Sequence, residues 1–156
     1  MEKKLQDLTD KIIEYVNNVG VQYCDARAEQ QVKKSILIEN EEIEHIRDSE
    51  DKGIGVRLIK NGSWSFCSIT NPNSFEEIKD ILDKTIKNSD YAQSNKIDLH
   101  ENQINKKQIN FPVLKKPSIN ELTSIGLECN KIINETPTII KAVTNPYYTI
   151  NSKYFK

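Results

Sequence analysis

The chain has 156 residues, enough for one ordinary domain with a buried core, or for one domain and part of another. Its formal net charge is −1, with 37% hydrophobic and 29% charged residues, so no overall charge attracts it to nucleic acid or to an anionic membrane. No apolar run is long enough to span a bilayer, and the start of the chain lacks the apolar segment of a signal peptide. We therefore expect a cytoplasmic protein with no membrane and no nucleic-acid partner.

The first expected element is a helix over roughly residues 3–19. Its apolar residues recur at spacings of three and four, and Gly20 follows as a suitable left-handed cap. From residue 21 to 70 the period changes to two, which predicts strands. In the first of them Cys24, Ala26 and Ala28 form a small apolar face that allows a helix to pack closely.

Two further strand segments are expected before the strongest turn signal. Residues 35–39 contain an apolar run, whereas in residues 41–50 Ile43 and Ile46 are out of phase with strict alternation. The second segment is therefore predicted to be a bulged or edge strand.

Asn61-Gly62 predicts a tight β-hairpin, because a type I′ turn needs positive φ at both central residues. Pairing Lys60 with Ser63 then fixes the register of the two strands. One face of this hairpin holds Ile54, Val56, Leu58, Cys67 and Ile69, and the other holds Gly55, Arg57, Ile59, Trp64, Phe66 and Ser68. Since both faces are largely apolar, we expect a cover on each: helices on one and another part of the protein on the other.

The second half of the chain predicts two more helices. The Ser74/Glu77 and Ser118/Glu121 pairs form capping boxes ahead of apolar stripes, placing helices near residues 74–88 and from residue 118 to Thr136-Pro137. Strands are predicted at 138–143 and 147–150, and the β-forming residues at the end suggest a strand left unpaired by a cut.

The predicted fold class is α+β, a largely antiparallel sheet with a central Asn-Gly hairpin, packed by about three helices. We expect an N-terminal domain over 1–90, a polar connector over 91–117, and a helix with strands over 118–156 that continues toward a missing C-terminal part.

The chain offers few candidates for catalysis or metal binding. Its three cysteines are far apart and odd in number, as expected for reduced, structural thiols. His100-Glu101 begins a pattern that a second histidine would complete, but Asn105 stands in that place, and His45 is expected at a strand edge. Because a catalytic zinc needs about three protein ligands and an open position, we predict neither catalytic nor metal-binding residues, and no cofactor, in this chain.

A set of residues in order along the chain resembles the TldD/PmbA (TldE) metallopeptidase family. The resemblance covers roughly residues 5–88, and the part after Ser118 is consistent with the same N-terminal region. The signature consists of Tyr23, Asp25, Arg27, Gly53, Gly55, Arg57, Gly62, Trp64, Phe66 and Ser68.

The resemblance implies the N-terminal portion of an enzyme that cleaves short or unfolded peptides. In TldD-type members zinc is bound by an HExxxH motif in the C-terminal part, which is not found here, so this portion is expected to be inactive alone. The implied partners are the C-terminal domain of the intact protein, a second TldD/PmbA-type subunit and, in the intact enzyme, peptide substrates.

Several signature residues have structural interpretations from the sequence itself. Asp25 and Arg27 lie two apart on one strand face and are expected to form an ion pair or to hold a seam between domains. Gly53 and Gly55 continue as a strand, which indicates close approach of a backbone or ring and not a phosphate loop. The possible interface residues are Arg57, Ile59, Trp64 and Phe66, with a second small core as the alternative.

Three functional hypotheses follow. The first is a truncated TldD/PmbA-type protein, either the peptidase or its metal-free PmbA/TldE-type partner. The second is a free-standing peptide-binding or assembly module that adds a strand at the edge near residues 41–50. The third is a nucleic-acid-linked regulator, as the family's older description as a gyrase modulator suggests, against which the net charge argues.

Overall fold

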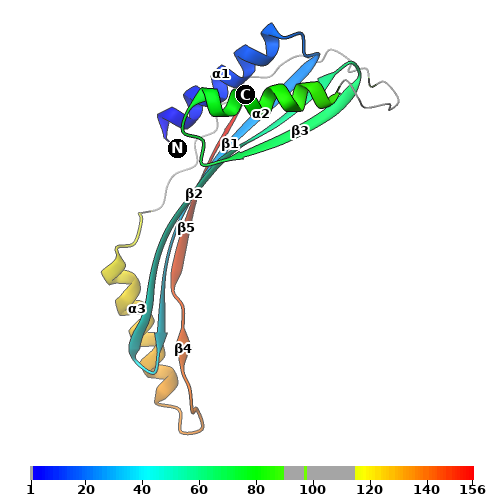
Figure 1. Ribbon diagram of the computed structural model, residues 1–156. Helices are drawn as coiled ribbons and strands as arrows, with labels where there is room; N and C mark the ends of the chain where they lie inside the picture. Colours follow the sequence, from blue (N-terminus) through cyan, green and yellow to red (C-terminus); the bar gives the residue numbers. More distant parts are fainter. Residues whose placement is uncertain (1, 90–96, 98–114) are drawn as a thin grey trace. The chain divides into compact units, whose positions relative to one another are not determined.

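The computed structural model describes residues 2–89, 97 and 115–156. Within these residues the chain forms three helices and five strands (Figure 1). In chain order they are α1 (Lys3–Asn18), β1 (Tyr23–Glu39), β2 (Glu42–Lys60), β3 (Ser63–Thr70), α2 (Phe75–Ser89), α3 (Ile119–Asn134), β4 (Val143–Thr144) and β5 (Tyr147–Phe155). The sheet order is β3-β2-β1-β4, and β5 also pairs with β1. The predicted α+β fold with an antiparallel sheet is confirmed.

The contacts divide the chain into two compact units. Unit 1 comprises Met1–Gln31, Asp51–Gln103 and Asn151–Lys156, and unit 2 comprises Val32–Glu50 and Ile104–Ile150. The strands β1, β2 and β5 each contribute one part of their length to each unit. The predicted division at residues 90 and 117 stays a prediction, and most of its connector lies outside the described residues.

The core of unit 1 lies between two helices and one face of the sheet. α1 and α2 place their apolar stripes on the sheet face that carries Ala26 and Ala28. Both alanines are fully buried, and their small side chains let the helices pack close to the sheet. The other buried members are Leu5, Leu8, Ile12, Val16, Ile54, Val56, Leu58, Ile69, Ile78, Leu82 and Ile86. Burial of these side chains provides most of the driving force for folding of this unit.

The β2–β3 hairpin has the register that the sequence predicts. Lys60 pairs with Ser63, and the ladder continues to Gly53 opposite Thr70. Asn61 and Gly62 have φ of +52° and +77°, as a type I′ turn requires. The prediction of this hairpin is therefore confirmed residue by residue.

The three predicted helices are confirmed, and the predicted capping box is complete at α3, whereas ahead of α2 the Glu77 carboxylate accepts from the amide of Asn73 instead of Ser74. Gly20 follows α1 with φ of +72°. The hydroxyl of Ser74 accepts the amide hydrogen of Glu77 at 3.4 Å ahead of α2, and Ser118 with Glu121 forms a reciprocal capping box at α3. In the described part of the chain no helix is long and apolar enough to cross a membrane.

The strand predictions need three corrections. Residues 35–39 and 41–50 do not form separate short strands, since they belong to the continuous strands β1 and β2. Residues 138–142 are not a strand, and β4 is limited to Val143–Thr144. The final strand is not unpaired, because β5 runs beside β1, with reciprocal amide bonds between Ala26 and Lys156.

Unit 2 packs α3 against its part of β1 around a small core of Ile36, Ile38 and Leu122. Gly126 lies at the closest point of this contact, where an added Cβ would meet the Ile38 Cδ1 atom at 2.6 Å. The absence of a side chain at residue 126 thus lets Ile38 and Pro146 pack directly on the helix.

The turn that joins β1 to β2 lies in unit 2 and contains no glycine. Asn40 and Glu41 have φ of +47° and +68°, a conformation that costs an ordinary residue about 1 kcal/mol. The fully buried Asn130 of α3 binds this turn, since its Oδ1 accepts the Glu41 amide hydrogen at 2.7 Å and its Nδ2 donates to the carbonyls of Ile38 and Ala142. One buried amide thus joins helix, turn and neighbouring strand.

We predict that Asn130→Ala lowers the free energy of unfolding by about 2–4 kcal/mol, because it leaves several buried backbone groups without partners. Asn134→Ala is the matched control, since it removes only an exposed hydrogen bond to Glu41 and should cost about 0–1 kcal/mol. Urea unfolding followed by circular dichroism measures both. Equal losses for the two variants would contradict the role given to Asn130.

Candidate functional site

The open face of unit 1 is the sheet face opposite α1 and α2. On it Phe66, directly across the strands from Arg57, has 68% of its surface exposed. The helices provide the first of the two predicted covers, whereas among the described residues no second cover lies over Phe66. A single exposed ring is ordinary on a protein surface, so the residues around Phe66 decide what this face can bind.

Asp25 of β1 is the centre of the polar part of this face. Its Oδ2 accepts hydrogen bonds from Nε and Nη2 of Arg57, each at 2.6 Å, and from the hydroxyl of Tyr23 at 2.9 Å. Its Oδ1 lies 3.3 Å from Nε of Arg27, which confirms the expected ion pair on that strand. The second and shorter pair, to Arg57 on β2, was not anticipated from the sequence.

Aromatic rings surround the Arg57 guanidinium. Its carbon lies 5.1 Å from the centroid of Trp64 and 6.0 Å from that of Tyr23. Trp64 also contacts Tyr23 edge-on and stacks on Phe66 at 6.1 Å. The guanidinium is therefore fixed by a carboxylate and by two rings together.

Two adjoining hollows form a groove on this face. The first, of about 230 Å³, is lined by Asp25, Arg27, Gly55, Val56, Arg57, Phe66 and Cys67. The second, of about 480 Å³, shares Arg27 and Gly55 with it and continues along Glu29, Gln31, Asp51, Lys52, Gly53, Ile54, Ser68, Ile69 and Thr70. We call this combined feature the open-face groove.

β5 contributes a residue to this region that the sequence interpretation missed. The guanidinium of Arg27 lies 5.7 Å from the ring centroid of Phe155, whose surface is 60% exposed. Further along β1 and β5, Lys153 and Glu29 form an ion pair at 3.0 Å. The only signal in the sequence was the run of β-forming residues at 147–155, and its partner strand was not identifiable.

The signature glycines have different structural reasons. Gly62 needs its positive φ in the turn, where its amide also donates to Gln22. An added Cβ at Gly53 would lie 2.9 Å from the carbonyl oxygen of Ile69, so the chain itself excludes a side chain there. At Gly55 nothing lies within 4 Å of that position, which faces the open groove.

The structure thus brings most of the signature residues together. Tyr23, Asp25, Arg27, Gly53, Gly55, Arg57, Trp64, Phe66 and Ser68 lie along the open-face groove or touch its lining residues, whereas Gly62 belongs to the turn. Among the possible interface residues, Ile59 is only 1% exposed and so is already buried within the unit. Phe66, by contrast, offers a large apolar surface.

Two groups of this cluster, Arg57 and Tyr23, have raised pKa values. The bond from Asp25 raises the pKa of Arg57, and burial together with the same carboxylate raises the pKa of Tyr23. Both groups therefore keep their protons across the physiological range. The arrangement is suited to holding a ligand by charge and shape.

The three thiols differ in their surroundings. Burial, with a smaller contribution from the charge of Asp25, raises the pKa of the Cys24 thiol to about 12. Burial also raises the pKa of Cys67, whereas Cys129 is exposed on α3. Cys24 and Cys67 are therefore structural residues of the core and not nucleophiles.

The zinc that the family resemblance implies does not fit the residues that the structure describes. Among them no three His, Cys, Asp or Glu side chains are grouped so that they could hold a metal ion. His45 is exposed, and its Nδ1 lies 3.2 Å from the carbonyl oxygen of Glu44. The candidate segment from His100 to Asn105 lies outside the described residues.

Unit 1 has the architecture of an α+β domain in which two helices cover one face of an antiparallel hairpin sheet and leave a polar-aromatic groove on the other. Residues 24–89 match the family model described as PmbA/TldA metallopeptidase domain 1. This part of the chain, less than half of its length, is thus similar to the first domain of the PmbA/TldD family. No curated protein sequence matches the chain.

Solved structures share the fold. A proposed modulator of DNA gyrase from Bacteroides thetaiotaomicron matches 99% of this chain and 37% of its own, with a TM-score of 0.74 and 13% identity. A second proposed gyrase modulator, from Thermotoga maritima, covers 96% of this chain and 37% of its own at a TM-score of 0.62 and 12% identity. TldE from Thermococcus kodakarensis covers 96% of this chain and 36% of its own, with a TM-score of 0.69 and 13% identity. The chain therefore spans little more than a third of the length of these proteins.

The two groove glycines give a paired prediction. Gly53→Ala should lower the free energy of unfolding by about 1–3 kcal/mol, because the new Cβ meets a backbone oxygen that cannot move independently. Gly55→Ala should leave it unchanged or raise it by about 0.5–1 kcal/mol, since the space is open and alanine restricts the unfolded chain. Urea unfolding monitored by Trp64 fluorescence measures both. A destabilising Gly55→Ala would show that the chain itself requires this glycine.

Thiol labelling tests the burial of the cysteines. At pH 8 the raised pKa keeps the Cys24 thiol almost entirely protonated in the folded state, so we expect only Cys129 to react rapidly with an aromatic disulfide reagent. The labelling rate of Cys24 should rise with pH until about 12, as its raised pKa requires. Cys129→Ser should abolish the fast phase, and a second rapid thiol in that variant would contradict the assignment.

Proposed function

We propose that the chain is the N-terminal portion of a TldD/PmbA-type metallopeptidase, a cytoplasmic enzyme that cleaves short or unfolded peptides in its intact form. The observation that carries the proposal is the family match over residues 24–89, which includes the hairpin and α2. This portion acts as a folded scaffold, and the metal chemistry belongs to a C-terminal part. On its own it is inactive.

The open face supports a contact with the rest of such a protein. Arg57 and Trp64 are held in place by Asp25 and Tyr23, while Phe66 exposes 68% of its surface beside them. Aromatic and arginine residues at a partly exposed, rigid site are typical of protein interfaces. The C-terminal domain or a second TldD/PmbA-type subunit is the proposed partner for this face.

A metal-free PmbA/TldE-type subunit is the alternative within the same family. TldE from Thermococcus kodakarensis is among the structures with this fold, at a TM-score of 0.69. At 13% identity that likeness supports the fold and does not separate the two subunit types. The choice depends on residues beyond those that match domain 1.

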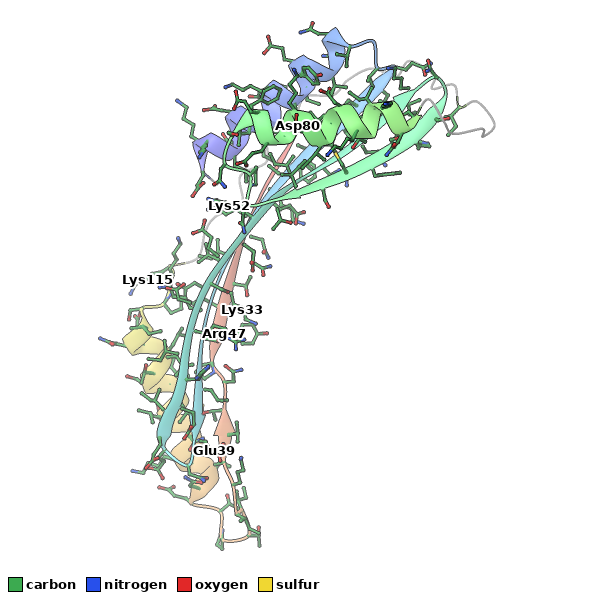
Figure 2. The ribbon with its side chains drawn as sticks, viewed as in Figure 1. Lys33, Glu39, Arg47, Lys52, Asp80 and Lys115 are labelled. Atoms are coloured by element: carbon green, nitrogen blue, oxygen red, sulfur yellow. The ribbon has the colours of Figure 1, made fainter. Side chains whose placement is uncertain are left out.

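A strand-addition module is a second candidate function. Among the described strands β3 pairs with β2 only from Gly53 to Lys60, so no strand flanks residues 42–52 on that side within the described part of the chain. Such an edge can accept an extended polypeptide by backbone hydrogen bonds. The charged side chains of this stretch, including Arg47, oppose unselective pairing (Figure 2).

The test compares the 156-residue chain with the complete product of its coding region. We expect no cleavage of quenched fluorescent peptides and no stoichiometric zinc for the chain alone. The complete product should carry an HExxxH segment and cleave the peptides in a chelator-sensitive way if it is TldD-type, or lack both properties if it is PmbA-type.

Three outcomes would contradict the proposal. Specific cleavage by the chain alone, or tight zinc binding in a ratio of one to one, would show that the chemistry lies here. A stop codon directly after Lys156, with a stable monomeric chain, would instead favour the free-standing strand-addition module.

A further inference from the structure

The floor of the open-face groove is Gly55, a glycine that no contact within the chain requires. Gly55 lies in the middle strand of the hairpin sheet, where glycine is unfavourable because it weakens the strand and adds no packing. Its φ is not positive, and an added Cβ would meet nothing within 4 Å. Gly53 differs, since the Ile69 carbonyl oxygen excludes a side chain there. The space above Gly55 is therefore kept open toward the outside.

The walls of the groove differ in chemistry from side to side. On the β1 side lies Arg27, whose side chain is 54% exposed. Its guanidinium contacts Asp25 through Nε, at 3.3 Å. On the β3 side Phe66 presents an exposed ring that is stacked on Trp64. A positive, forked donor thus lies on one side of the glycine floor and an apolar ring on the other.

In the first hollow the side chains leave a positive excess, whereas the second hollow adds Lys52 together with the carboxylates of Glu29 and Asp51. In the first hollow Arg27 and Arg57 share one carboxylate, that of Asp25. Arg57 directs two of its nitrogens to Asp25 Oδ2, so this pair is satisfied internally. The remaining N–H groups of Arg27 complement a carboxylate, which an arginine fork binds with two parallel hydrogen bonds.

We propose that the open-face groove binds, in trans, an extended segment of a partner protein that carries an acidic side chain and a bulky apolar side chain two positions apart. In an extended chain such residues point to the same side, about 7 Å apart. The carboxylate binds Arg27, the apolar side chain packs on Phe66, and the backbone between them passes over Gly55. This inference rests on the proposed contact of the open face with a second TldD/PmbA-type subunit, and it names by its chemistry the segment of that subunit that occupies the groove.

The groove is large enough for two side chains and the backbone that joins them. Its two hollows measure about 230 Å³ and 480 Å³ and meet at Arg27 and Gly55. Phe155, 60% exposed beside Arg27, adds a second ring on the β1 side that shields the carboxylate from water. Shielding strengthens an arginine–carboxylate pair, since water competes less for both groups.

The sole tryptophan of the chain, Trp64, reports on this groove. Titration of the 156-residue chain with a blocked peptide containing Phe-Gly-Glu should change Trp64 fluorescence and saturate. Matched peptides with Phe-Gly-Gln or Ala-Gly-Glu should bind at least about tenfold more weakly, because each lacks one of the two anchors. Peptide binding that ignores both replacements would overturn the proposal.

Three variants locate the binding on the protein. Arg27→Gln and Gly55→Val should each weaken the Phe-Gly-Glu peptide about tenfold or more, the first by removing the fork and the second by filling the floor. Gly55→Val should keep or raise the melting temperature, so its loss of binding is not a loss of folding. Arg47→Gln, which changes an exposed arginine in unit 2, is the control and should bind as the unchanged chain does (Figure 2).

Other outcomes are equally informative. If Gly55→Val binds normally, the floor is not used and the proposal is wrong. If sedimentation shows a dimer of the chain that Arg27→Gln dissociates, the occupant is a second copy and not a partner segment, which also overturns it. A failed peptide titration leaves the peptidase comparison untouched, because that assay does not depend on this groove.

Discussion

The register of the β2–β3 hairpin is the constraint on which unit 1 depends. Side chains alternate between the two faces of a strand, so one turn geometry assigns every residue of both strands to a face. It sends Ile54, Val56 and Leu58 into the core beneath α1 and α2, and it sends Gly55 and Arg57 to the open face. A slip by one residue would bury a guanidinium and expose three apolar side chains. The core and the groove are therefore two results of a single pairing.

Elements defined by local chemistry were predictable from the sequence, whereas those defined by distant contacts were not. Asn61-Gly62 needs only its own dihedral preferences, and the Ser118 capping box needs only residues three apart. The Asn40–Glu41 turn was missed because neither residue is glycine and its stability comes from Asn130, about ninety positions away in sequence. Similarly, the periodic residues of β1 were divided into short segments because nothing local shows that the strand continues between the two units.

The candidate site shows the same division. The Asp25–Arg27 pair follows from strand alternation alone and was expected, but the shorter Asp25–Arg57 pair depends on how β1 lies beside β2. Phe155 reaches Arg27 only because β5 pairs with β1. A single sequence states which residues share a strand face and is silent on which strands are neighbours. The resemblance to a family names these residues together without giving a physical reason for their grouping.

The two arginines that share Asp25 have different physical roles. Arg57 makes two 2.6 Å bonds to the carboxylate of Asp25, a side chain that is only 18% exposed. Aromatic rings lie against the Arg57 guanidinium. Such a pair fixes β1 to β2. Arg27, whose own side chain is 54% exposed, makes one 3.3 Å contact with Asp25. Exposed ion pairs of that kind contribute about 0–1 kcal/mol to stability. Its contact with Asp25 therefore does little for folding and instead orients the guanidinium over the groove, which lowers the entropy cost of binding a second carboxylate.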